Sequence, residues 1–259
     1  MLLEVKDLNI SLTSEKSVAE HISFRLGQGE MLSIVGSSGA GKTTICKAIM
    51  GLLGNTYRAD GEILFQGEDL LDLPERKRQT IYGKEICLIM QNPMTAFNPS
   101  IRVGRQMEKT YLLHHGKTPR QEMQRLFAAI LQKLGLEDTQ RILNSYPFTL
   151  SGGMLQRLMI AAALMCQPSL LVADEATTAI DACNRIGLMR ELKSFCKNGM
   201  SVLFVTHDLR SASVSDRILV MDRGQIVEQD TTERILNAPK EDYTKYLLNA
   251  CRLERRKMS

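Results

Sequence analysis

The chain has 259 residues, 44% of them hydrophobic, and a formal net charge of +4. This length is sufficient for one large α/β domain or two small ones, each with an adequate core. Lys and Arg form no basic block ahead of the C-terminal tail, which argues against a nucleic-acid-binding protein.

The chain has no pattern typical of a secreted or membrane-spanning protein. Glu4 and Lys6 stand where a signal peptide would need an apolar core. The longest apolar run, Leu158–Cys166, is far shorter than the roughly 18 residues needed to span a bilayer. The six cysteines are scattered without a C-x-x-C pair, as in a reducing compartment. We therefore expect a soluble, cytosolic protein that reaches any membrane through a partner.

Short strands separated by glycines are predicted in the N-terminal region, at Leu2–Val5, Ile22–Leu26 and Gly61–Phe65. Between the last two, the apolar run Met31–Val35 predicts a buried strand that enters a glycine-rich loop. Helical spacing follows over Thr43–Leu53. This order of strand, glycine loop and helix is the context that a phosphate-binding loop requires.

A further strand is predicted at Ile86–Met90, ending at Gln91. Helical spacing dominates from Ile101 to Gln167, where β-branched runs vanish, so we expect a helical insertion there. Strand and helix then alternate again, which predicts a largely parallel sheet covered on both faces. The predicted elements after the insertion are strand Leu170–Ala173, helix Ile186–Cys196, strands Val202–Thr206, Arg217–Met221 and Gln225–Glu228, and helices near Glu233 and Tyr243.

Residues 36–44, with the sequence GSSGAGKTT, form a complete phosphate-binding loop. Glycines let backbone N–H groups turn inward, and the following helix presents its positive end to an anion. Lys42 would supply a point charge to the β- and γ-phosphates, and the Thr43 hydroxyl can bind Mg²⁺. The expected contacts to the nucleotide are made by Gly36, Ser37, Ser38, Gly39, Ala40, Gly41, Lys42, Thr43 and Thr44.

Three predicted strands end in polar residues that can act on a phosphate. Asp174 follows a buried apolar run, which suits a carboxylate that holds Mg²⁺ through water, and Glu175 is placed to polarise an attacking water. His207 ends the strand Val202–Thr206, and Gln91 ends another. By itself a lone histidine is usually structural, and a lone glutamine at a strand end carries no functional information.

A serine and two glycines, Ser151, Gly152 and Gly153, precede a helix that begins near Met154. Such a segment caps a helix and can direct N–H groups toward an anion, although an ordinary N-cap has the same pattern. Because the phosphate loop already accommodates one ATP, a second anion site suggests a γ-phosphate presented by a partner subunit.

Residues 150–153, with the sequence LSGG, resemble the signature segment of the ATP-binding cassette (ABC) ATPases. Together with the upstream phosphate loop and the downstream strand ending in two carboxylates, they extend the resemblance over nearly the whole chain. The resemblance implies an α/β P-loop NTPase fold with a mixed, mainly parallel core sheet, an N-terminal antiparallel β subdomain and a helical signature subdomain. Residues 1–259 would be one domain. Its core would lie at about 1–95 and 168–230, its helical insertion at about 96–167 and its C-terminal helices at about 231–259.

The same resemblance implies residue roles. Gln91 matches the Q-loop glutamine, which reaches Mg²⁺ and the attacking water, and His207 matches the switch histidine, which contacts the γ-phosphate. Thr43 and Asp174 would be the other Mg²⁺ ligands. Asp181 matches the D-loop, which crosses the dimer interface. Each signature segment would act on the ATP of the other subunit.

The resemblance is closest to the nickel and oligopeptide importer ATPases, and within them to the D-type ATPase of nickel importers. The segments behind it include IMQNP at 89–93, YPF at 146–148, LQR at 155–157 and NAPK at 237–240, together with Tyr243-Thr244. It implies a second ABC ATPase subunit, with a heterodimer favoured over a homodimer, two integral membrane permeases and an extracytoplasmic solute-binding protein. The subunit would lie peripherally on the cytoplasmic face of the cell membrane.

Alternatives remain for the solute: nickel or a metal chelate, or a di- or oligopeptide. A soluble ABC ATPase without a transport role is the third hypothesis, although no coiled-coil, zinc or tandem-domain insertion is visible. The adjacent pair His114–His115 does not share a helix face and is an incomplete metal site. Leu12 stands near the place where relatives stack an aromatic ring on adenine, so the sequence does not define how the base is held.

Overall fold

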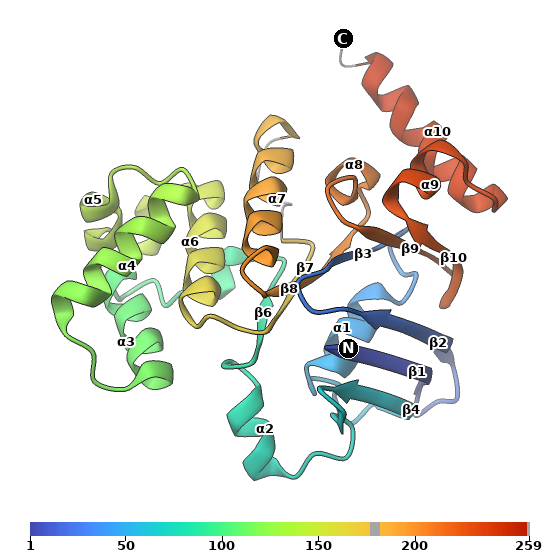
Figure 1. Ribbon diagram of the computed structural model, residues 1–259, viewed down its shortest axis with the longest axis horizontal. Coiled ribbons are helices and arrows are strands. Elements are labelled where there is room, and N and C mark those ends of the chain that lie inside the picture. Colours follow the sequence, from blue (N-terminus) through green and yellow to red (C-terminus); the bar gives the residue numbers. More distant parts are fainter. Residues whose placement is uncertain (177–181, 258–259) are drawn as a thin grey trace.

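The computed structural model describes residues 1–176 and 182–257, except for the side chains at 182–184 and 252–257. Figure 1 shows two sheets at the centre and right of the molecule, with a group of helices on the left. The predicted α/β class, with a mixed core sheet, an antiparallel N-terminal sheet and a helical region, is confirmed. The predicted division into subdomains by residue number stays a prediction.

The N-terminal sheet is antiparallel and has the order β2-β1-β4-β5. Its strands are β1 (Leu3–Leu12), β2 (Ser17–Leu26), β4 (Tyr57–Phe65) and β5 (Glu68–Asp69). Strands β1, β2 and β4 extend beyond the predicted segments because their other halves are half exposed and mix polar with apolar residues, and the two-residue β5 was not predicted. Buried residues such as Val5, Leu8, Ile22 and Ile63 belong to the apolar core that packs against this sheet.

The core sheet has the order β10-β9-β3-β8-β7-β6. Only β10 and β9 pair antiparallel among the described strand pairs of this sheet. Both β3 and β8 are buried along their whole length, as expected for central parallel strands. The strands are β3 (Met31–Gly36), β6 (Ile86–Ile89), β7 (Leu170–Asp174), β8 (Ser201–Thr206), β9 (Arg217–Asp222) and β10 (Gln225–Thr231).

Helices occupy the predicted regions, with some differences in length. The α-helices are α1 (Lys42–Ile49), α2 (Glu75–Ile81), α3 (Val103–His115), α4 (Arg120–Lys133), α5 (Thr139–Asn144), α6 (Gly152–Met165), α7 (Ala182–Cys196), α8 (Leu209–Ala212), α9 (Thr232–Asn237) and α10 (Asp242–Lys257), and the 3-10 turns are η1 (Pro93–Thr95) and η2 (Pro147–Thr149). The prediction that the first helix continues to Leu53 is wrong, because Gly51 takes the left-handed conformation just after it ends. Helices α2 and α8 are too short to show a helical period in the sequence.

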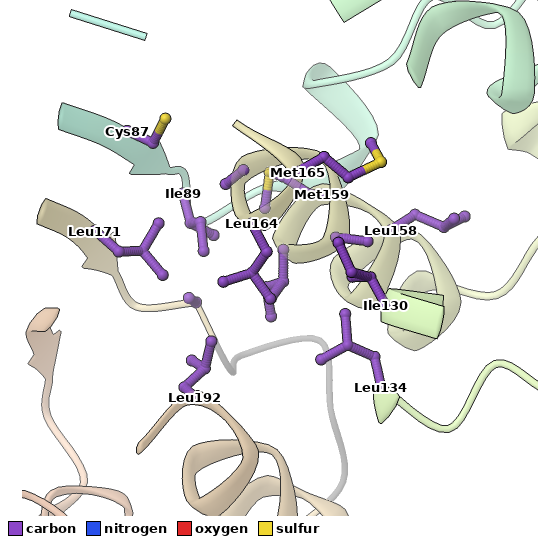
Figure 2. Close-up of a cluster of buried hydrophobic side chains, with 14 of the residues drawn as sticks. Cys87, Ile89, Ile130, Leu134, Leu158, Met159, Leu164, Met165, Leu171 and Leu192 are labelled. Carbon is purple, nitrogen blue, oxygen red and sulfur yellow. The ribbon is translucent and has the colours of Figure 1, made fainter. Parts of the chain in front are cut away.

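The helices α3 to α6 gather on the left of Figure 1, away from the antiparallel sheet. Figure 2 shows how they are joined to the core sheet: Leu164 of α6 lies among Ile89 of β6, Leu171 of β7 and Leu192 of α7. On its other side α6 packs against α4. This apolar contact holds α6, the helix that begins in the LSGG segment, against β6, which leads to Gln91, and β7, which leads to the two carboxylates.

The parallel strands place the polar strand-end residues on one edge of the sheet. The phosphate loop follows β3, Gln91 follows β6, Asp174 ends β7, and His207 follows β8. Because β3, β8, β7 and β6 are consecutive neighbours in the sheet, these residues belong to adjacent strand ends. This edge is where open α/β sheets bind their ligands.

No helix in the described part of the chain is long and apolar enough to cross a bilayer. His115, one of the adjacent histidine pair, makes two contacts within the chain: its Nε2 lies 2.9 Å from the Met165 carbonyl oxygen, and its ring stacks on Tyr111. Among the described residues, no group of three or more His, Cys, Asp or Glu side chains could hold a metal ion.

Replacing Phe204 tests the apolar core that supports the carboxyl ends of the parallel strands. Phe204 lies on β8 and is 0% exposed, so we expect Phe204→Ala to lower the free energy of unfolding by about 3–5 kcal/mol. Chemical denaturation followed by circular dichroism measures the change. Phe148→Ala is the matched control, because Phe148 is 66% exposed and should change stability by about 0.5 kcal/mol or less. Equal losses in the two variants would contradict the assigned core.

Candidate active site

The phosphate loop adopts a conformation that needs glycine at defined positions. A Cβ on Gly36 would collide with the carbonyl oxygen of Met221 on β9. Gly41 has φ 95°, and a Cβ there would lie 2.8 Å from the Val18 carbonyl oxygen. Helix α1 begins directly after Gly41, and among the described side chains none caps it. The N-terminus of α1 therefore presents its positive end at the loop without a capping side chain.

Lys42 lies folded under this loop and is only 5% exposed. Its Nζ donates to the carbonyl oxygens of Gly36 at 2.8 Å and Ser37 at 2.7 Å. Burial lowers the pKa of Lys42, and the nearby carboxylates of Glu175 and Asp174 oppose that shift. The ammonium group is thus held inside the loop, where a bound anion would compensate its buried charge.

Thr43 and Asp174 bring two oxygen groups together next to the loop. The Thr43 hydroxyl donates to Asp174 Oδ1 at 3.2 Å. Burial raises the pKa of Asp174, while the hydrogen bond from Thr43 acts in the opposite direction. Mg²⁺ prefers oxygen ligands, commonly one or two protein groups together with water and phosphate oxygens. The hydroxyl and carboxylate oxygens therefore fit a magnesium ion.

Glu175 is at the centre of a second cluster. Its Oε2 accepts a hydrogen bond from Gln91 Nε2 at 2.7 Å, and its Oε1 lies 3.2 Å from His207 Nδ1. The backbone of Glu175 has φ 48°, a left-handed conformation that is costly for a residue with a side chain. A hydrogen bond from its backbone N–H to the Val205 carbonyl oxygen, at 2.9 Å, holds it in place. Strained backbone of this kind is concentrated at functional sites.

Asp208, to which the sequence analysis gave no role, anchors the turn that carries His207. Its carboxylate accepts hydrogen bonds from Arg185 Nη1 at 3.1 Å, the Ser211 hydroxyl at 2.8 Å and the Arg210 backbone N–H at 3.0 Å. Burial raises the pKa of Asp208, but these donors outweigh it and hold the pKa below its usual value. An Asp directly before Leu209 was the available sequence signal, because this residue type commonly caps helices.

The signature residues lie on a different part of the molecule from the phosphate loop. Ser151 caps α6, with its hydroxyl accepting from the Met154 N–H at 3.3 Å, and Gly152 and Gly153 form the first turn. In Figure 1, α6 and α1 are well separated. The structure thus brings Lys42 and Thr43 close to the residues at the strand ends. Ser151, Gly152 and Gly153 are not part of this group. Asp181 lies outside the described residues.

Comparison with known proteins identifies the family. The family described as ABC transporter matches residues 19–178. The metal-staphylopine import system ATP-binding protein CntD of Staphylococcus aureus is 41% identical over 251 residues, covering 96% of this chain and 92% of CntD. The oligopeptide transport ATP-binding protein OppD of Bacillus subtilis is 41% identical over 254 residues, covering 95% of this chain and 71% of OppD.

Among solved structures, the dimeric ATP-binding cassette MJ0796 in a post-hydrolysis state, bound to ADP and Pi, has a TM-score of 0.79. It is 26% identical to this chain, and the alignment covers 89% of this chain and 99% of that cassette. The fold, the arrangement of the phosphate loop and strand-end residues, and the sequence matches agree. The chain therefore belongs to the ABC transporter family, in which it is an ATPase subunit.

Proposed function

We propose that this subunit hydrolyses ATP to power a membrane importer for nickel or a chelate of nickel or another metal. The observation that carries the metal assignment is the 41% identity, over 96% of this chain, to a metal-staphylopine import ATPase. A di- or oligopeptide importer is the second candidate, favoured by the equal identity to an oligopeptide transport ATPase. The grouping of Lys42, Gln91, Asp174, Glu175 and His207 supports hydrolysis in both cases.

The chain's own residues would bind the nucleotide as follows. Residues 36–44 hold the phosphates with backbone N–H groups, and the buried ammonium of Lys42 neutralises the β- and γ-phosphates. Thr43, Gln91 and Asp174 would hold Mg²⁺, which offsets negative charge on the phosphates when bound. The Thr43–Asp174 hydrogen bond keeps these two ligands adjacent before the ion arrives.

Glu175 would accept a proton from the attacking water. Its two carboxylate oxygens contact Gln91 and His207 respectively, so the side chain is already oriented toward both neighbours. The Gln91 amide then helps to position the water, and the His207 ring contacts the γ-phosphate. Because phosphoryl transfer depends mainly on positioning and charge neutralisation, this set of groups suffices.

The ATP site would be completed by a second ATPase subunit. Ser151, Gly152 and Gly153 begin a helix that lies apart from the chain's own phosphate loop, so their N–H groups can meet the γ-phosphate of a partner. Asp181 would cross the interface. We favour a heterodimer of two ABC ATPases over a homodimer, and closure of the pair over two ATP molecules would drive transport. The dimeric state of the related cassette MJ0796 supports the pairing of two ATPase subunits.

The surface that would contact two integral membrane permeases includes exposed residues that follow Gln91 or precede the LSGG segment in the sequence. Met94, Ile101 and Phe148 are exposed apolar residues, with exposed fractions of 54%, 41% and 66%. Ile101 and Tyr146 line one hollow, and the rings of Tyr146 and Phe148 stack at 5.6 Å. Clustered apolar side chains at a surface favour a protein partner. This contact would hold the subunit at the cytoplasmic face of the membrane, where the permeases meet an extracytoplasmic solute-binding protein.

Uptake measurements in cells that lack this subunit test the solute. We expect accumulation of radioactive nickel, supplied free or as a chelate, to fall to the background level. Uptake of labelled di- and oligopeptides should stay unchanged, and restoring the gene should restore nickel uptake. Loss of peptide uptake with normal metal uptake would transfer the function to the second candidate.

Glu175→Gln tests the proposed base. The amide keeps the shape of the side chain but cannot accept the proton, so we expect ATP binding to remain and turnover to fall by about 100-fold or more. Binding by calorimetry and phosphate release in the assembled transporter measure these quantities. Glu137→Gln, a change at an exposed residue, is the matched control and should hydrolyse ATP normally. Near-normal turnover by Glu175→Gln would refute its role.

Ser151→Arg tests whether the LSGG segment acts on the ATP of the partner subunit and not on the ATP of its own chain. A large cation at the start of α6 should block the approach of a partner's nucleotide, so ATPase activity of the assembled complex should fall at least about tenfold. The isolated chain should still bind ATP with its own loop, because Ser151 is not part of that loop. Lost binding in the isolated variant would contradict this assignment.

A further inference from the structure

The C-terminal helix reaches back to the phosphate loop through one hydrogen bond. The backbone N–H of Ser37 donates to the Tyr243 hydroxyl at 3.1 Å, across 206 positions of sequence. Tyr243 is the second residue of α10 and is partly buried. The proposed scheme for hydrolysis gives Tyr243 no role, so this contact between α10 and the phosphate loop has no assigned function.

The contact acts on the same peptide unit as Lys42. The Gly36 carbonyl and the Ser37 N–H belong to one trans peptide group, so they point in opposite directions. Lys42 Nζ donates to the Gly36 carbonyl oxygen at 2.8 Å, and Tyr243 accepts from the N–H on the opposite side. The first peptide of the loop is therefore held from both sides, and its rotation would break both hydrogen bonds.

The start of α10 is itself held firmly. The two carboxylate oxygens of Glu228, on β10, accept from the backbone N–H groups of Lys240 at 2.8 Å and Glu241 at 3.2 Å. Burial raises the pKa of Glu228, but these donors outweigh it and the pKa stays below its usual value. The carboxylate thus remains ionised and fixes the segment that leads into Tyr243.

Packing and a second hydrogen bond hold the rest of the helix over the sheet. Tyr243 and Leu247 pack on a small apolar cluster that includes Val35, the residue directly before Gly36. Farther along α10, Arg210 Nη2 donates to the Cys251 carbonyl oxygen at 2.7 Å. Arg210 belongs to α8, the helix that follows His207. Helix α10 therefore extends from the phosphate loop to α8, the helix that follows His207.

We propose that Tyr243 is a positioning residue for the nucleotide site: its hydroxyl sets the orientation of the Gly36–Ser37 peptide and thereby keeps Lys42 in place to receive the triphosphate. The C-terminal helix in this way supports the ATP site through the backbone of the phosphate loop. This inference rests on the proposed binding of ATP by residues 36–44.

Tyr243→Phe in the full-length chain tests the proposal, because it removes the hydroxyl and keeps the ring. We expect the dissociation constant for ATP, measured by calorimetry in the presence of EDTA, to rise about twofold to tenfold, as for the loss of one hydrogen bond. The thermal midpoint should stay within about 1 °C of the wild type. In the assembled transporter, KM for ATP should rise by a similar factor while kcat stays within about twofold.

Tyr246→Phe is the matched control, because Tyr246 lies on the same helix, stacks on Tyr243 and is 67% exposed. It should bind ATP like the wild type. Unchanged ATP affinity in Tyr243→Phe would overturn the proposal, and so would a loss of affinity that accompanies an equal loss in Tyr246→Phe or a drop of several degrees in the thermal midpoint. If the wild-type chain itself fails to bind ATP, the proposed function fails instead.

Discussion

The parallel pairing of β3, β8, β7 and β6 is the constraint on which the site depends. Val35 lies opposite Thr206, and Asp174 lies opposite Val205, so the strands end at the same level. The residues that follow them are brought to one edge without any contact between their side chains being needed. A shift of one residue in the register of these strand pairs would move each side chain to the opposite face of the sheet, and the site residues would no longer lie together. The buried apolar side chains of β8 and β7 specify this register.

The balance of charge around the buried Lys42 is the second constraint. Lys42 is buried next to two half-buried acidic groups, Asp174 and Glu175, whose charges oppose the effect of burial on its pKa. The loop carbonyls and the Thr43 hydroxyl provide the remaining hydrogen bonds. The site is therefore arranged for an anion and a cation together, which is the charge pattern of a nucleotide with Mg²⁺. The strained backbone of Glu175 is retained in this setting because neighbouring strands fix it.

Much of the fold and site could be predicted because the informative residues are local in sequence. Runs such as Leu170–Ala173 and Val202–Thr206 are apolar along both faces, which is typical of a buried parallel strand. The outer half of β1 and the short helix α8 were not predicted, because half-exposed strands and single turns lack a clear period. Asp208 and Tyr243 were also left without roles, since their partners lie 23 and 206 positions away.

By itself, the sequence determined the family, the α/β class and the chemical groups of the site, because a glycine loop, a signature and strand-end carboxylates each carry their chemistry in a few adjacent residues. Only the tertiary structure decided that Glu175 contacts both Gln91 and His207, and that α10 reaches the phosphate loop. Those contacts depend on the order of strands in the sheet and on packing between distant segments, and neither has a local signal in the chain.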